Sequence, residues 1–77
     1  MRMFKPAGIR CGALDIISIG NDEFESMILC DYEEKTQIEA AAAMGVSRGT
    51  LQRLLYSARF KIIDALLNSK GIKIEKK

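Results

Sequence analysis

The stretch 36–56 constrains the fold of this chain more than any other segment. Thr36 followed three residues later by Glu39 is a capping box, which favours the start of a helix. Gly45 is the residue type that ends helices in the left-handed conformation, and Ser47 is a good N-cap for the next helix. These signals predict helices over residues 37–44 and 48–68. A short helix, a turn with glycine and a longer helix form the helix-turn-helix pattern, with an ordinary helical hairpin as the alternative.

The residues around this turn suit two helices that cross at close range. Ala41 is small enough to let the helices approach, and Val46 is expected to plug the turn as a buried side chain. The longer helix turns one apolar stripe toward the shorter one, because its apolar residues recur at helical spacing. The members of this predicted core stripe are Leu51, Leu54, Leu55, Ala58, Ile62, Ala65 and Leu66.

The flanking segments predict one more helix and two short strands. Asn21 as N-cap, with carboxylates in the first turn, predicts a helix over 22–34. Residues 1–13 look irregular because proline and glycine interrupt them. Residues 14–19 are rich in β-branched side chains and 71–76 alternate in polarity, so we expect two strands that pair within or between chains. The predicted fold class is mainly α: an N-terminal arm over 1–20, a three-helix domain over 21–69, and a basic tail over 70–77.

Size and composition exclude several classes of protein. A chain of 77 residues has one marginal core and no room for a two-domain enzyme. It lacks histidine, and its two cysteines, Cys11 and Cys30, cannot supply the four ligands of a structural zinc site. We therefore expect no metal, no cofactor, no catalytic residue and no enzymatic activity. Reduced thiols are favoured over one disulfide, and no signal peptide or membrane span is evident, so we expect a cytoplasmic protein.

The small net charge of +2 hides a strong division along the chain. Residues 21–40 hold seven acidic side chains and one basic one, whereas residues 41–77 hold eight basic and two acidic ones. Between Ser47 and Lys61 lie four basic residues and no acidic one. This distribution indicates that the longer helix faces a polyanion.

The exposed side of the longer helix carries residues suited to double-stranded DNA. Arginine can make two hydrogen bonds to guanine in the major groove, and glutamine can make two to adenine. We therefore expect Arg48, Gln52 and Arg53 to read bases, with Gly49 allowing close approach and Tyr56 at the groove edge. Hydroxyls, amides and helix N-termini position such proteins on phosphates. The expected phosphate contacts are Thr36, Gln37, Ser47, Thr50 and Arg59.

A second apolar stripe on the same helix predicts self-association. Phe60, Ile63 and Leu67 fall on the side that carries Arg53 and Tyr56, away from the core stripe. One of the terminal strands or a second subunit must cover these side chains. We expect a homodimer, because two-fold helix-turn-helix dimers bind half-sites about 34–36 Å apart.

Several short segments resemble one family of small proteins. They are Phe4-Lys5-Pro6-Ala7-Gly8, Asp22-Glu23-Phe24-Glu25, Met44-Gly45-Val46-Ser47-Arg48 and Ser57-Ala58-Arg59. Together they resemble the predicted DNA-binding family called domain of unknown function 134, found in bacteria and archaea. Its helix-turn-helix is similar to the promoter-reading region 4 of sigma factors. The resemblance implies that helix 37–44 supports and helix 48–68 recognises DNA in a regulator of transcription. The alternative is a protein-interaction module that docks on RNA polymerase or another regulator through the predicted helix 22–34, here called the acidic helix.

Overall fold

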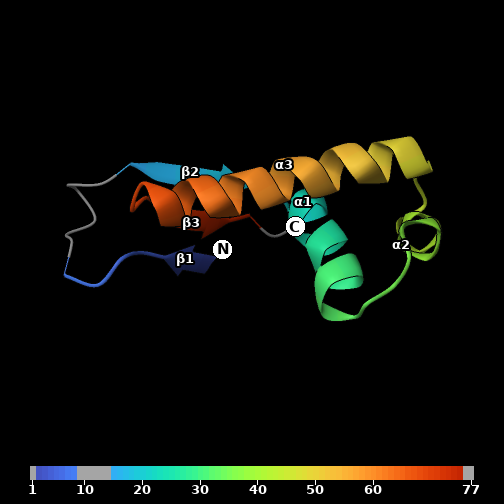
Figure 1. Cartoon of the computed structure of the whole chain (residues 1–77), viewed down its shortest axis with the longest axis horizontal. Helices are drawn as coiled ribbons and strands as arrows, with labels where there is room; N and C mark the ends of the chain where they lie inside the picture. The colour runs from blue at the N-terminus through green and yellow to red at the C-terminus, as the bar shows by residue number, and fades with distance from the viewer. Residues whose placement is uncertain (1, 9–14, 76–77) are drawn as a thin grey trace.

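The computed structural model describes residues 2–8 and 15–75, and Cys11 and Leu14 lie outside this part of the chain. Four helical segments and a small sheet make up the described fold (Figure 1). The helical segments are α1 (Asn21–Met27), the π-helical segment η2 (Ile28–Tyr32), α2 (Gln37–Met44) and α3 (Arg48–Leu67). The strands are β1 (Arg2–Phe4), β2 (Ile16–Ile19) and β3 (Gly71–Ile74). The described chain is therefore mainly helical, as the sequence predicts.

The two predicted strands pair within one chain. β2 and β3 are parallel, with Ile17 opposite Ile72, and all the helices form the connection between them. Parallel neighbours need such a long crossover, which explains why strands so far apart in sequence are adjacent. β1 adds to the other edge of β3 in the antiparallel sense, giving the order β1-β3-β2. The prediction that residues 1–13 are irregular is wrong for β1, because a three-residue strand has no sequence period and is held by β3.

The sheet packs one face against α3. Figure 1 shows α3 running along the strands for about its C-terminal half. Ile19 and Ile74, which are partners in the register, are both buried on this side. On α3 the residues Leu51, Leu55, Ala58 and Ala65 are buried, so most of the predicted core stripe is confirmed. Alanine at two of these positions lets backbone approach α3 closely.

One member of the predicted core stripe is exposed. Leu66 retains 69% of its surface, although the sequence pattern placed it in the core. It lies one residue, and therefore about 100° around the helix, beyond buried Ala65. Its neighbours in a small surface depression include Phe4 and Pro6, which flank the side chain without burying it. Where α3 packs on the sheet, the buried side of the helix therefore includes Ala65 and excludes Leu66, which the helical period had assigned to the core.

The first helix starts and ends differently from the prediction. Gly20, not Asn21, is the N-cap, and the Glu23 carboxylate accepts a hydrogen bond from the Gly20 N–H at 2.8 Å. The predicted single helix over 22–34 is instead α1 followed by η2, where the Glu33 N–H donates to the Ile28 carbonyl at 2.9 Å. Reaching back five residues widens the last turn into a π-helix. The helix therefore ends at Tyr32.

The local signals around α2 and the start of α3 are confirmed. The Glu39 N–H donates to Thr36 Oγ1 at 3.1 Å, and the Thr36 N–H donates to Glu39 Oε1 at 2.8 Å. Gly45 has φ 69°, and the Val46 N–H donates to the Ala41 carbonyl, which ends α2 at Met44. Ser47 accepts from the Thr50 N–H at the start of α3.

A small cluster holds α2, η2 and α3 together. Leu29 from η2, Ala40 and Ala41 from α2, and Leu51 from α3 are buried against one another. Cys30, Met44 and Val46 pack at its edge. Val46 is half-buried, so it covers the turn only in part. Because two of the four buried members are alanine, the larger Leu29 and Leu51 side chains provide most of the apolar contact.

Candidate nucleic-acid interface

The predicted reading residues share one exposed side at the N-terminal half of α3. Gly49, Gln52, Arg53 and Tyr56 are all exposed there, on the side opposite the buried leucines. Figure 1 shows α2, seen end-on, at the same end of the molecule as the first turns of α3. The N-termini of both helices therefore contribute to one end of the structure, remote from the sheet.

Gln37 connects the start of α2 to two of the predicted reading residues. Its Oε1 atom accepts a hydrogen bond from Gln52 Nε2 at 3.0 Å and a longer one from Arg48 Nε at 3.4 Å. All three side chains are polar and at least partly exposed. The structure thus brings together Gln37, Arg48 and Gln52, although Gln37 and Gln52 are 15 residues apart in the sequence.

A second set of polar side chains follows the first turn of α3. The Ser47 hydroxyl donates to Thr50 Oγ1 at 3.0 Å, and Arg53 Nη2 donates to the same Thr50 oxygen at 3.2 Å. Thr50 Oγ1 accepts both bonds, so its own hydroxyl proton is free to donate outward. The contact with Thr50 also restrains the Arg53 side chain along the helix, which lowers its conformational freedom before any partner binds.

Two of the four basic residues on α3 have acidic partners within the described chain. Arg59 Nη2 lies 2.6 Å from Asp31 Oδ1, and Arg59 Nε donates to the other oxygen of the same carboxylate. Lys61 Nζ lies 2.8 Å from Glu23 Oε1. The Asp31 hydrogen bond also raises the pKa of Arg59. The acidic helix and the basic helix, treated as separate surfaces on sequence grounds, are in fact packed together.

This pairing leaves two arginines as the cations of the predicted interface. In the part of the chain that the structure describes, neither Arg48 nor Arg53 forms an ion pair. Arg59, predicted to contact phosphate, is instead held at the flank by Asp31. Local sequence could not reveal this pairing, because Asp31 of η2 and Arg59 of α3 are 28 residues apart and meet only in the folded chain.

Glu23 connects α1 to α3 through two of its three hydrogen bonds, and the third caps α1. Its carboxylate accepts from the Gly20 N–H, from Lys61 and from the Ser57 hydroxyl. Burial raises the pKa of Glu23, but the bonds from Lys61, Ser57 and Gly20 outweigh it and hold the pKa below the ordinary value of 4.5. This cluster fixes α3 against α1 and so sets the direction of the exposed side that carries the predicted reading residues.

We expect Glu23→Gln to remove part of the acid sensitivity of folding. The lowered pKa means that the ionised carboxylate stabilises the fold fully above about pH 4.5, and that this contribution is lost as the pH falls through the folded pKa. The variant should unfold at lower urea than the wild type at pH 7, and the difference should shrink on acidification. Urea unfolding followed by circular dichroism at several pH values measures both. If the difference in urea midpoint between the two proteins stays the same down to pH 3, the ionised Glu23 carboxylate does not stabilise the fold as proposed.

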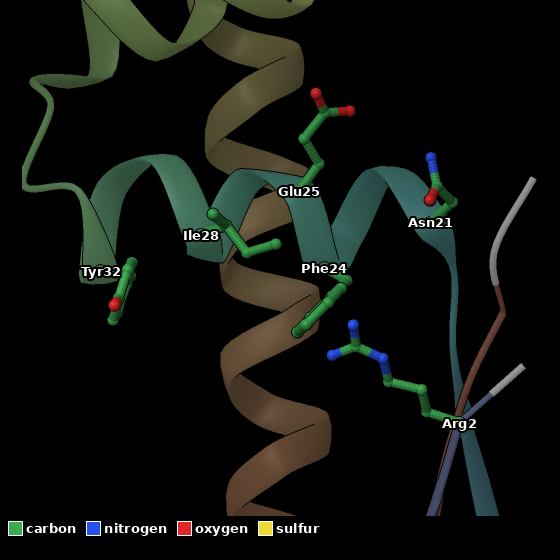
Figure 2. A pocket seen from close by; sticks show the side chains of 6 residues that line it. All are labelled: Arg2, Asn21, Phe24, Glu25, Ile28 and Tyr32. Atoms are coloured by element: carbon green, nitrogen blue, oxygen red, sulfur yellow. The ribbon is translucent and has the colours of Figure 1, made fainter.

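The structure has a groove on the outer side of the acidic helix that the sequence did not predict. It has a volume of about 630 Å³ and is lined by Arg2, Asn21, Phe24, Glu25, Ile28 and Tyr32. Figure 2 shows Phe24 and Arg2 side by side, with Ile28 and Tyr32 farther along the helix. In the sequence, the spacing of four residues between Phe24, Ile28 and Tyr32 indicates that these three side chains share one face of the helix. The contribution of Arg2 could not be anticipated without β1.

The described residues hold no arrangement that indicates metal or thiol chemistry. Within residues 2–8 and 15–75, no three Cys, Asp or Glu side chains are grouped so that they could hold a metal ion. Burial raises the pKa of the Cys30 thiol, which disfavours the reactive thiolate. None of the described helices combines the length and apolarity needed to cross a membrane.

Comparison with known proteins places the chain in a family. The family model described as "Protein of unknown function DUF134" matches residues 1–76. A UPF0251 protein of Dehalococcoides mccartyi (strain BAV1) is 46% identical over 72 residues, which cover 94% of this chain and 62% of the relative. A UPF0251 protein of Aeromonas salmonicida is 42% identical, over 94% of this chain and 71% of the relative.

The relatives differ in how far they extend beyond the matched region. The chain covers less than two thirds of the Dehalococcoides protein, and 48% of a UPF0251 protein of Moorella thermoacetica that is 44% identical. No solved structure matches the chain. The family match spans nearly every residue, and the identities exceed 40%. The family predicted from the short segments is therefore confirmed. The chain belongs to the family of proteins of unknown function DUF134.

Proposed function

We propose that the chain is a sequence-specific DNA-binding protein that regulates transcription, with α2, the turn and α3 acting as a helix-turn-helix. The observation that carries the proposal is the exposed N-terminal half of α3. It presents Arg48, Gln52 and Arg53 on one side, with no acidic partner for either arginine among the described residues. In this proposal the short α2 and the longer α3 correspond to the helix-turn-helix that the sequence resemblance relates to region 4 of sigma factors.

In this proposal α3 enters the major groove by its first three turns. Arg48, Gln52 and Arg53 contact base edges, where arginine and glutamine each offer paired donors or acceptors. Gly49 has open space where a Cβ would stand, so the helix backbone can approach the duplex. Tyr56, exposed one turn later, lies at the edge of the groove.

Phosphate contacts come from the caps of both helices. The free N–H groups of the first turns of α2 and α3 favour an anion. Thr36 Oγ1 accepts from Glu39, so its hydroxyl proton remains free to donate to a phosphate, as does that of Thr50. Gln37 and Ser47 complete this set. Arg59 joins it only if a phosphate competes with Asp31.

Selection of bound duplexes from a random pool tests the proposal. We expect enrichment of a short motif, followed by a steep fall in affinity for that motif as salt is raised. The logarithm of the binding constant should fall linearly with the logarithm of salt concentration, with a slope of about −0.9 for each phosphate contacted. No enriched motif, or a binding constant that is flat in salt, would contradict the proposal.

The second candidate is a protein-interaction module that docks on RNA polymerase or another regulator. The groove over Phe24, Ile28 and Tyr32 on the acidic helix favours it, because an apolar groove on a charged helix suits a protein partner. Pull-down from lysate with and without nuclease separates the two functions. Polymerase captured after nuclease treatment supports docking, and capture that depends on intact DNA supports the first proposal.

A further inference from the structure

The outer side of α3 carries an apolar stripe that nothing described covers. Tyr56, Phe60, Ile63 and Leu67 are 73%, 71%, 61% and 78% exposed. Their separations along the chain are four, three and four residues. This is the spacing of the a and d positions of a coiled coil, where apolar residues of one helix meet those of another.

The opposite side of α3 has the same pattern and is already buried. Leu51, Leu55, Ala58 and Ala65 belong to a stripe of alternating four and three residues that packs against the rest of the chain. β2 and β3, which were candidates to cover the outer stripe, instead bury Ile19 and Ile74 in the core. One helix therefore presents two seams, of which the described chain fills only one.

We propose that a second copy of this chain covers the outer stripe, with the two α3 helices packed antiparallel about a two-fold axis between Phe60 and Ile63. In this register Phe60 of one copy lies against Ile63 of the other, and Tyr56 lies against Leu67. The interface is self-complementary, as two-fold symmetry requires. The pairing forms without DNA, and it shares Tyr56 with the surface that the proposed function assigns to DNA.

The exposed area fits a dimer interface. Aromatic side chains bury about 150–250 Å² each, so the four residues of the stripe with neighbouring Leu66 offer on the order of 700 Å² per copy. A stable interface of standard size buries about 800 Å² per partner. Phe4, which lines a depression together with Leu66, extends the same apolar surface toward β1. The apolar area that each copy offers is therefore close to the area that each partner of a standard interface buries.

Charge along the same side of α3 favours the antiparallel arrangement. Arg53 stands one turn before Tyr56 on the face of the stripe and is exposed. Parallel helices would place Arg53 opposite Arg53 in the continuing seam, and like charges in contact destabilise a pair. In the antiparallel register Arg53 lies beyond Leu67 of the other copy, past the end of its α3, and so does not face a second Arg53. Only the uncharged part of the face is then buried.

Sedimentation equilibrium of the full chain without nucleic acid tests the pairing. We expect a wild-type dimer in the micromolar range and at least a tenfold higher dissociation constant for Ile63→Glu. Ile38→Glu is the matched control, because Ile38 is 66% exposed on α2, away from the stripe, and should not weaken the dimer. Circular dichroism verifies folding, and Ile63→Gln replaces Ile63→Glu if the charge disturbs the helix. A wild-type monomer at 200 µM, or a dimer unaffected by Ile63 variants, would overturn the proposal.

A distance between the two helices tests their direction. A spin label at Gln52→Cys, in a Cys11→Ser and Cys30→Ala background that keeps the wild-type unfolding temperature, reports the separation of the two copies. Residue 52 is nine to ten residues from the two-fold axis, so at 1.5 Å per residue the antiparallel pair gives about 30 Å. Parallel helices give about 10 Å. The shorter distance would overturn the antiparallel arrangement, and the longer one would support it.

Discussion

We expect Arg53→Ala to weaken binding to a selected duplex by about 1–3 kcal/mol and to relax the choice of base at one position of the site. Arg53 is exposed, forms no ion pair among the described residues, and is restrained by its 3.2 Å bond to Thr50. A restrained guanidinium with free donors is suited to bidentate contact with a guanine edge. Fluorescence anisotropy with the selected duplex and with single-base variants measures both affinity and selectivity.

The charge-matched control for Arg53 is Lys5→Ala. Lys5 is exposed just after β1, so its removal lowers the net charge equally without touching α2 or the first turns of α3. Arg53→Lys is a second informative variant, because it keeps the charge but lacks the planar fork of arginine. We expect it to retain the salt dependence and lose the base selectivity. Equal losses for Arg53→Ala and Lys5→Ala would show that Arg53 contributes only general electrostatic attraction.

The largest loss of stability is expected from Leu51→Ala, at about 2–5 kcal/mol. Leu51 is 0% exposed and packs in the cluster that holds η2, α2 and α3 together. Its buried neighbours Ala40 and Ala41 have no side-chain freedom with which to fill the space, so a cavity should remain. Since small domains have a total stability of roughly 5 kcal/mol or little more, the variant should be close to unfolding at 25 °C.

Urea unfolding followed by circular dichroism measures this loss, with Ile38→Ala as control. Ile38 is of similar size but exposed on α2, so its removal should change the unfolding free energy by no more than about 0.5 kcal/mol. A loss below 1 kcal/mol for Leu51→Ala would mean that the cluster collapses around the smaller side chain. In that case the Leu51 side chain would not be what holds η2, α2 and α3 together.

The parts of the fold that sequence predicted best are those set by short-range hydrogen bonds. α2 has the predicted bounds because Thr36 and Glu39 cap its start and Gly45, at φ 69°, ends it. α3 starts at Arg48 because Ser47 accepts from the Thr50 N–H three residues away. Each of these contacts lies within a few residues, so its partners are already neighbours in the unfolded chain.

Features that depend on distant segments were predicted poorly. β1 is a strand only because β3 lies beside it. Leu66 is exposed because the sheet buries the neighbouring Ala65 and only flanks Leu66. The ion pairs of Arg59 with Asp31 and of Lys61 with Glu23 join residues 28 and 38 positions apart. No local pattern distinguishes these two cations from Arg48 and Arg53.

The sequence alone therefore determined the family, the caps of α2 and α3, and the polar side of α3 with its proposed reading residues. Local backbone hydrogen bonds and helical periodicity suffice for these features, because both act over one or two turns. The tertiary structure decided which cations remain available, how the strands pair, and that the stripe of Phe60, Ile63 and Leu67 stays open. These depend on which surfaces meet when α1 and the sheet pack on α3, and that choice is made by contacts between residues far apart in the chain.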